Sequence, residues 1–349
     1  MALTNLELSE LLARTAGQHE GNKQKAARRA AHAALLWPIE VADVAAGDGD
    51  VRSLPSVGPW IGTLIESWLA GSPEVGEPPE LRAGYRSYAS ARSFLEGEPS
   101  WRDDLRGDLQ MHTTYSDGAL SVAAMARAGV ERGYEYVSIT DHSKGLAIAG
   151  GMDESVLARQ SAEIDSVNLA LEDGGSDLRV LRSLEMNLSP TGEGDMDGAA
   201  LGELDLVIGS FHSKLRIKDD QTERYVAGLR NPDIHILGHP RCRMWGRRAG
   251  LLADWARVFE EAASLDKAIE VDAHPNRQDI DSSLLFLARD AGVRISIGTD
   301  SHHTDEMRFV DIGLAAVAEA GIPRARILNY LPRNELLEWA ASVGEGSSS

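Results

Sequence analysis

The sequence predicts an α/β protein in which a seven-unit (β/α) barrel follows a small all-α domain. From about residue 104 onward, strand-like apolar runs alternate with amphipathic helical stretches, a pattern typical of parallel βαβ units. Residues 1–95 show helical apolar spacing and no strand-like run. A dinucleotide-binding fold is not indicated, because no glycine-rich fingerprint follows the first expected strand.

Residues 1–95 are expected to form a helical domain. Leucines recur at helical spacing within residues 3–12, and a second helix covers residues 22–36 and ends before Pro38. Residues 54–62 place a tight glycine turn between two short helices. The outward-pointing amides of such a helix-hairpin-helix-like turn can hold a DNA phosphate.

The barrel is expected to span residues 104–335, with helices between its strands. The expected strands are residues 107–112, 136–141, 180–188, 204–212, 234–239, 268–273 and 294–300. The expected helices are residues 122–132, 154–171, 222–229, 253–265, 283–291 and 312–320. The small polar segment 344–349 is expected to be a disordered tail.

Ionisable side chains recur at the ends of these strands. Five of the 10 histidines in the chain lie there: His112, His142, His212, His239 and His302. Glu185 lies in the third strand, Asp300 ends the seventh, and Asp117 follows the first. A single histidine at a strand end is more often an ordinary hydrogen-bonded residue. Because the carboxyl ends of barrel strands converge on one face, their recurrence predicts a metal-binding cluster instead.

The ligand types indicate the ions and the reaction. Imidazoles and carboxylates without suitable cysteines fit Zn²⁺, Mn²⁺ or Fe²⁺ better than Ca²⁺ or Mg²⁺. The cluster has more ligands than one catalytic ion uses, so two or three ions and no organic cofactor are expected. Clustered ions can bind a phosphate, activate a water and stabilise a leaving oxygen, which favours phosphoester hydrolysis.

Composition limits the partners and the compartment. The net charge of −19 disfavours non-specific nucleic-acid binding, although residues 14–29 are locally basic. No apolar run is long enough for a membrane span, and the N-terminus does not resemble a signal peptide. The single cysteine, Cys242, fits a reducing compartment. A cytoplasmic protein without a membrane partner is therefore expected.

The motifs resemble those of a known family. They are residues 108–118, 140–143, 210–213, 238–240 and 299–302, together with the strand of Glu185. On these motifs, residues 104 to about 330 resemble the polymerase and histidinol phosphatase (PHP) domain, in particular that of bacterial family X DNA polymerases. The N-terminal block resembles their helix-hairpin-helix region more weakly. Polymerase activity is not expected, since the chain has no paired-aspartate nucleotidyltransferase motif.

The resemblance implies a distorted seven-unit (β/α) barrel with up to three metal ions. It implies three ligand sets: His112, Glu185 and Asp300; Glu185, His212 and His239; Asp117, His142 and His302. Glu185 would be the bridge, and Glu185 and Asp300 the catalytic carboxylates. Gln110 would lie beside the first set, where the family usually has histidine. Its amide oxygen is a weaker ligand than imidazole.

Basic residues in the loops that follow the strands are candidates for substrate phosphate. We single out Lys144, Arg247 and Arg277, because an arginine fork suits a phosphate and lysine supplies a point charge. The simpler interpretation of each is a solvated loop charge.

Several functions remain open on the sequence alone. The resemblance implies a 3′–5′ exonuclease or 3′-phosphatase that acts on nucleic-acid ends, with DNA held through the N-terminal domain. The acidic charge favours a small-molecule phosphatase, acting for example on histidinol phosphate or nucleotides. Gln110 motivates a third hypothesis, a non-catalytic DNA-end-binding protein with a decayed site. An amidohydrolase is disfavoured, because such barrels generally carry His-x-His on the first strand.

Overall fold

The computed structural model describes residues 2–47 and 49–345, and the chain divides into two compact units. The first unit is Met1–Pro99 with Trp245–Ala249, and the second is Ser100–Met244 with Gly250–Ser349. The division falls between the expected domain ends at residues 95 and 104. No sequence signal pointed to the grouping of residues 245–249 with the first unit.

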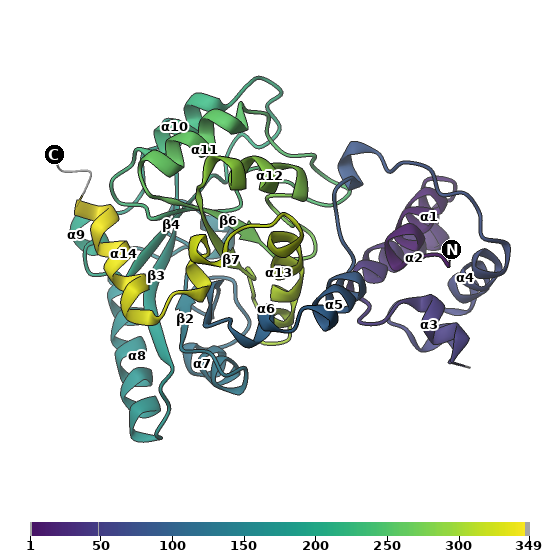
Figure 1. Ribbon diagram of the computed structural model, residues 1–349, viewed down its shortest axis with the longest axis horizontal. Helices are drawn as coiled ribbons and strands as arrows, with labels where there is room; N and C mark the ends of the chain where they lie inside the picture. Colours follow the sequence, from purple (N-terminus) through teal and green to yellow (C-terminus); the bar gives the residue numbers. More distant parts are fainter. Residues whose placement is uncertain (1, 48, 346–349) are drawn as a thin grey trace. The chain divides into compact units, whose positions relative to one another are not determined.

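The regular elements in the described residues of the first unit are all helices (Figure 1). Its α-helices are α1 (Asn5–Gly17), α2 (Gly21–Leu36), α3 (Val41–Ala46), α4 (Pro59–Gly71) and α5 (Tyr88–Gly97). α1 begins at a capping box in which Thr4 and Glu7 satisfy each other's backbone groups. Leu8 and Leu12 of α1 are fully buried in the core that also holds the alanines of α2. The small alanine side chains let the two helices pack closely.

The segment expected to resemble a helix-hairpin-helix is built from unequal halves. Its first half is a single 3₁₀ turn, η1 (Val51–Ser53), and its second half is the longer helix α4. Gly58 precedes α4 without a side-chain cap, and Pro59 starts the helix. The backbone amides in the first turn of α4 therefore meet no capping side chain.

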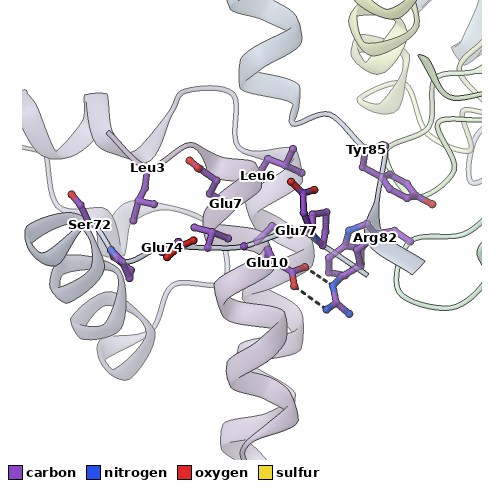
Figure 2. Close-up of a pocket in the computed structure, with 16 residues that line it drawn as sticks. Leu3, Leu6, Glu7, Glu10, Ser72, Glu74, Glu77, Arg82 and Tyr85 are labelled. Carbon is purple, nitrogen blue, oxygen red and sulfur yellow. Dashed lines mark hydrogen bonds and ion pairs between the residues drawn. The ribbon is translucent and has the colours of Figure 1, made fainter. Parts of the chain in front are cut away.

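A pocket of about 530 Å³ lies in the first unit, lined by α1 and by residues 72–78 (Figure 2). Glu7, Glu74 and Glu77 are among its lining residues. Arg82 is already paired with Glu10, its Nε donating to Oε2 at 2.7 Å. The acidic lining is unsuited to a nucleic-acid phosphate.

The second unit is a nearly closed barrel of seven parallel strands in the order β1 to β7. The strands are β1 (Gly107–Met111), β2 (Tyr136–Ile139), β3 (Arg179–Asn187), β4 (Leu206–Ser210), β5 (Ile236–Leu237), β6 (Ala268–Asp272) and β7 (Arg294–Gly298). A parallel bridge between Met111 and Ser301 brings the two edges together, and the His112 amide donates to the Ser301 carbonyl at 2.8 Å. The predicted fold class is confirmed.

Helices alternate with these strands (Figure 1). They are α6 (Ser100–Asp103), α7 (Val122–Glu131), α8 (Glu154–Asp173), α9 (Gly198–Leu201), α10 (Thr222–Leu229), α11 (Trp255–Ser264), α12 (Ser282–Ala291), α13 (Val310–Glu319) and α14 (Arg333–Glu345). Ser121, Asp153 and Asp281 cap α7, α8 and α12 with their side chains. No helix in the described part of the chain is long and apolar enough to cross a membrane.

Helix α14 extends the barrel unit past residue 335. Leu336 and Trp339 of this helix join the buried cluster that contains Tyr136 and Leu206. Residues 344 and 345 of the expected tail are helical, and residues 346–349 lie outside the described part of the chain.

A buried lysine directly before β6 allows a test of how burial affects the stability of the barrel unit. Lys267 is 3% exposed, and its Nζ donates to the Asn231 carbonyl at 2.5 Å. Burial lowers its pKa to about 8 from the ordinary 10.5. The unfolded chain therefore binds more protons between these values, so this lysine should raise stability by up to about 3 kcal/mol as the pH rises through that window.

Lys267→Met should accordingly be more stable than wild type at pH 7, and this difference should shrink between pH 8 and about 10.5. Urea unfolding of both proteins at several pH values measures the difference. A constant difference across this window would contradict the assignment.

Candidate metal centre

The candidate ligands follow consecutive strands and lie on one rim of the barrel. His112 directly follows β1, Glu185 lies in β3, and His212 comes two residues after β4. His239 and Asp300 come two residues after β5 and β7. Because the strands are parallel and in sequential order, these ends converge.

The carboxylate of Glu185 is buried among imidazoles from four strands. Its Oε2 lies 3.0 Å from Nδ1 of His142 and 3.6 Å from Nε2 of His112. Its Oε1 lies 2.9 Å from Nε2 of His239 and 3.3 Å from Nε2 of His212. Since the two oxygens face different imidazoles, this carboxylate has the geometry to bridge two ions.

His112, Glu185 and Asp300 form a group whose ligand atoms lie within 4.8 Å of one another. Nε2 of His112 is 3.0 Å from Oδ1 of Asp300. This is the set expected for one ion. Gln110, expected beside it, is oriented differently: its amide faces the buried carboxylate of Glu270, to which the amide nitrogen can donate.

A second group unites His142, Glu185 and His212. The predicted second set pairs His212 with His239 instead of His142. The imidazoles of His212 and His239 do both contact Oε1 of Glu185, and their ring centroids lie 5.4 Å apart. His239 thus lies beside this second group but is not a member of it.

The third group contains Asp117, His142 and His302, as expected, with His112 added. Oδ1 of Asp117 lies 3.3 Å from Nε2 of His302 and 3.5 Å from Nε2 of His142. The ring of His112 stacks on the rings of both His142 and His302, with centroids 4.5 Å apart in each pair. His112 therefore belongs to two groups.

Unpartnered polar atoms indicate that these residues fit metal ions. Neither ring nitrogen of His112 or His212 has a hydrogen-bond partner among the described residues, although all four atoms are buried. The same holds for Oε2 of Glu185 and Nδ1 of His239. Buried polar atoms are normally hydrogen-bonded, and coordination would use these lone pairs. Imidazole with carboxylate suits Zn²⁺, Mn²⁺ or Fe²⁺.

Both central carboxylates stay ionised. Burial alone would raise the pKa of Glu185, but His142 and His212 outweigh it and hold that pKa well below its ordinary value. Burial likewise opposes the ionisation of Asp300, and Arg277 with His112 keeps its pKa well below normal. Negative charge is therefore available for cations at neutral pH.

Two buried acids of β6 adjoin the site, although neither is among the predicted ligands. Glu270 and Asp272 are 0% exposed, and burial raises both pKa values well above their ordinary range. Nε of Arg277 lies 3.0 Å from Oδ2 of Asp300 and 3.4 Å from Oδ2 of Asp272. The sequence signal was the Glu-x-Asp spacing, which puts both side chains on one face of a strand.

Asp141 lies in the motif of residues 140–143 but has no predicted role. It is fully buried next to His142, and it accepts hydrogen bonds from the Thr113 amide at 2.8 Å and the Ser116 hydroxyl at 2.5 Å. These contacts hold the loop that carries Asp117. Their origin is tertiary, so the Thr-Asp-His motif alone did not show them.

The other two phosphate candidates, Lys144 and Arg247, belong to none of the three ligand groups. Nζ of Lys144 is 2.6 Å from Oε1 of Glu154 on α8, and the lysine side chain is 45% exposed. Arg247 is exposed and belongs to the segment that groups with the first unit.

Known proteins are similar to large parts of the chain, although no family model matches it. The DNA polymerase/3′-5′ exonuclease PolX of Bacillus subtilis is 34% identical over 256 residues, which are 72% of this chain and 43% of that protein. The chain thus spans less than half of that relative. A probable phosphatase of Serratia proteamaculans is 28% identical over 242 residues, 66% of this chain and 91% of that protein.

Among solved structures, histidinol phosphate phosphatase from Lactococcus lactis superposes with a TM-score of 0.47 and 16% identity, over 62% of this chain and 94% of that one. This likeness is too weak to carry an argument. The sequence relatives, the barrel and the three ligand groups agree with the motif resemblance. Over its barrel unit the chain is therefore similar to PHP-domain proteins.

Proposed function

We propose that this protein hydrolyses phosphate esters at the 3′ ends of nucleic acids, as a 3′–5′ exonuclease or 3′-phosphatase. The convergence of three ligand groups on one face, two of them sharing Glu185, carries the proposal. Two or three bound Zn²⁺, Mn²⁺ or Fe²⁺ ions would polarise the phosphoryl oxygens and lower the pKa of the attacking water. The similarity to a relative named as an exonuclease supports the nucleic-acid substrate.

The proposed roles follow from the contacts. Glu185 and Asp300 are the catalytic carboxylates, held ionised by their neighbours. We assign Arg277, whose Nε lies 3.0 Å from Oδ2 of Asp300, to the substrate phosphate, because a planar guanidinium can form two parallel hydrogen bonds to it. We assign Lys144 and Arg247 to weaker contacts with more distant parts of a substrate. The single cysteine supports a cytoplasmic location.

The test is a metal-loaded sample incubated with 3′-labelled DNA carrying either a 3′-hydroxyl or a 3′-phosphate, beside a panel of small phosphomonoesters. Shortening or dephosphorylation of the DNA supports the proposal. Turnover confined to the small esters supports a small-molecule phosphatase, which the net charge of −19 and the probable-phosphatase relative favour. Metal binding and DNA-end binding without turnover would support the decayed site that Gln110 suggested.

We also propose that DNA contacts the first unit through α2. Lys25, Arg28 and Arg29 are exposed on this helix, and together with Asn22 they line a basic hollow. Removal of one phosphate contact of this kind weakens binding to all sequences about equally. It also lowers the slope of log affinity against log salt concentration by about one.

Charge reversal of Arg28 and Arg29 to glutamate should therefore raise the KM for DNA by about tenfold or more at low salt and flatten its salt dependence. Turnover of a small phosphomonoester should not change. The control reverses two exposed arginines of the barrel unit, Arg127 on α7 and Arg333 on α14. An equal rise of KM in this control would refute the assignment to α2.

A further inference from the structure

Helix α10 contacts the chain on both sides of His212. Arg224 of this helix is 5% exposed, and its Nη2 donates to the carbonyl of Ser213 at 2.8 Å. Its guanidinium lies over the ring of Phe211, 4.3 Å from the centroid. One side chain thus contacts the residue before and the residue after the candidate ligand.

The ring of Phe211 is enclosed by the same helix. Tyr225 meets it edge-on, with centroids 5.7 Å apart and an interplanar angle of 78°. A Cβ at Gly228, one turn further along α10, would lie 3.0 Å from the tip of that ring. Phe211 therefore has little freedom to turn, and the backbone of His212 is fixed with it.

The neighbour of Arg224 on α10 contacts the segment that carries the second imidazole. Tyr225 is 0% exposed, and its hydroxyl donates to the carbonyl of Pro240 at 2.6 Å. Pro240 directly follows His239. The thiol of Cys242 donates to the Phe211 carbonyl at 3.2 Å, which ties the two ligand-bearing segments to each other. Consecutive residues of one helix thus hold the segments of both imidazoles that face Oε1 of Glu185.

The charge of Arg224 needs an explanation beyond one hydrogen bond. Its Nε and Nη1 are buried and have no hydrogen-bond partner among the described residues. Burial lowers its pKa, and the groups that act on it there include no carboxylate. Burying such a cation is costly unless other contacts offset it. The stack on Phe211 is the contact that compensates here, because an aromatic face attracts a desolvated guanidinium.

We propose that Arg224 and Tyr225 are positioning residues for the imidazoles of His212 and His239, and thereby for an ion held with Glu185. The inference rests on metal binding by this centre, as in the proposed function, and not on the identity of the substrate. Neither residue reaches a candidate ligand directly; each acts through the backbone beside it.

The test compares Arg224→Met and Tyr225→Phe with wild type by competitive Zn²⁺ titration, with ions per chain and melting temperature measured in parallel. Outer partners of metal ligands typically contribute 10- to 100-fold to affinity. We expect about a tenfold loss for Tyr225→Phe and up to about 100-fold for Arg224→Met, for one ion only. Arg224→Lys, which keeps the positive charge and a hydrogen-bond donor, should retain most of the wild-type Zn²⁺ affinity.

Tyr136→Phe is the matched control. Tyr136 is also fully buried, and its hydroxyl donates to the carbonyls of Leu328 and Leu331, both at 3.1 Å, in the cluster that α14 completes. This variant should lose stability without a change in Zn²⁺ affinity. Unchanged affinity in both α10 variants, or an equal loss in Tyr136→Phe, overturns the inference. Absence of activity on DNA with the expected affinity pattern would count against the proposed substrate alone.

Discussion

Glu185→Gln is expected to lower phosphoester hydrolysis by about 1000-fold or more and to remove at least one ion per chain. Its carboxylate belongs to two of the three ligand groups and faces imidazoles from four strands. Glutamine keeps the shape but loses the charge, and it turns an N–H₂ toward ring nitrogens. Loss of the several kcal/mol that bound ions supply corresponds to a rate loss of this size.

The centre offers a matched control for this substitution at Glu270. This residue is also 0% exposed, but it belongs to none of the three ligand groups, and burial raises its pKa well above the ordinary value. Because burial favours the neutral form of this acid, glutamine is a close mimic of it. Glu270→Gln should therefore change activity by less than about tenfold.

Activity and metal content are measured together, by phosphate release and elemental analysis. If Glu185→Gln kept both its ions and its rate, the bridging role of Glu185 would be wrong. If both variants lost their ions equally, the effect would come from altered packing of the barrel interior instead of from the bridge.

The fold and the candidate ligands were predictable because both leave local signals. A buried parallel strand reads as a short apolar run, and the residue that follows it is placed on one rim by the barrel itself. His112, His212 and His239 needed only this placement to be brought together.

The contacts around those ligands were not predictable, because their partners come from distant parts of the chain. Gln110 was expected beside the first ion, yet its amide faces Glu270, which lies five strands further along the barrel. Arg277 was chosen for phosphate from its place in a loop, and nothing local showed its contact with Asp300. Arg224 and Tyr225 looked like ordinary residues of an amphipathic helix.

The metal-free protein is expected to bind Zn²⁺ at its third group with an affinity that rises about tenfold per pH unit between pH 7 and 9. Burial would lower the pKa of His302, but its hydrogen bond to Asp117 and the charge of Asp300 outweigh this and raise the pKa to about 10. Since an imidazole must lose its proton to coordinate, binding at neutral pH releases that proton.

The Glu185–His212 side of the centre should depend less on pH. Burial dominates at His212 and lowers its pKa, so this imidazole is already neutral at pH 7.

Calorimetry in two buffers of different ionisation enthalpy counts the protons released when each ion binds. His302→Asn should remove the steep pH dependence of one ion and leave that of the others unchanged. An affinity that stays flat from pH 7 to 9 in wild type would show that His302 is not a ligand. A steep dependence that survives in His302→Asn would assign the proton to another imidazole, and His142, whose pKa Glu185 raises against the effect of burial, is the next candidate.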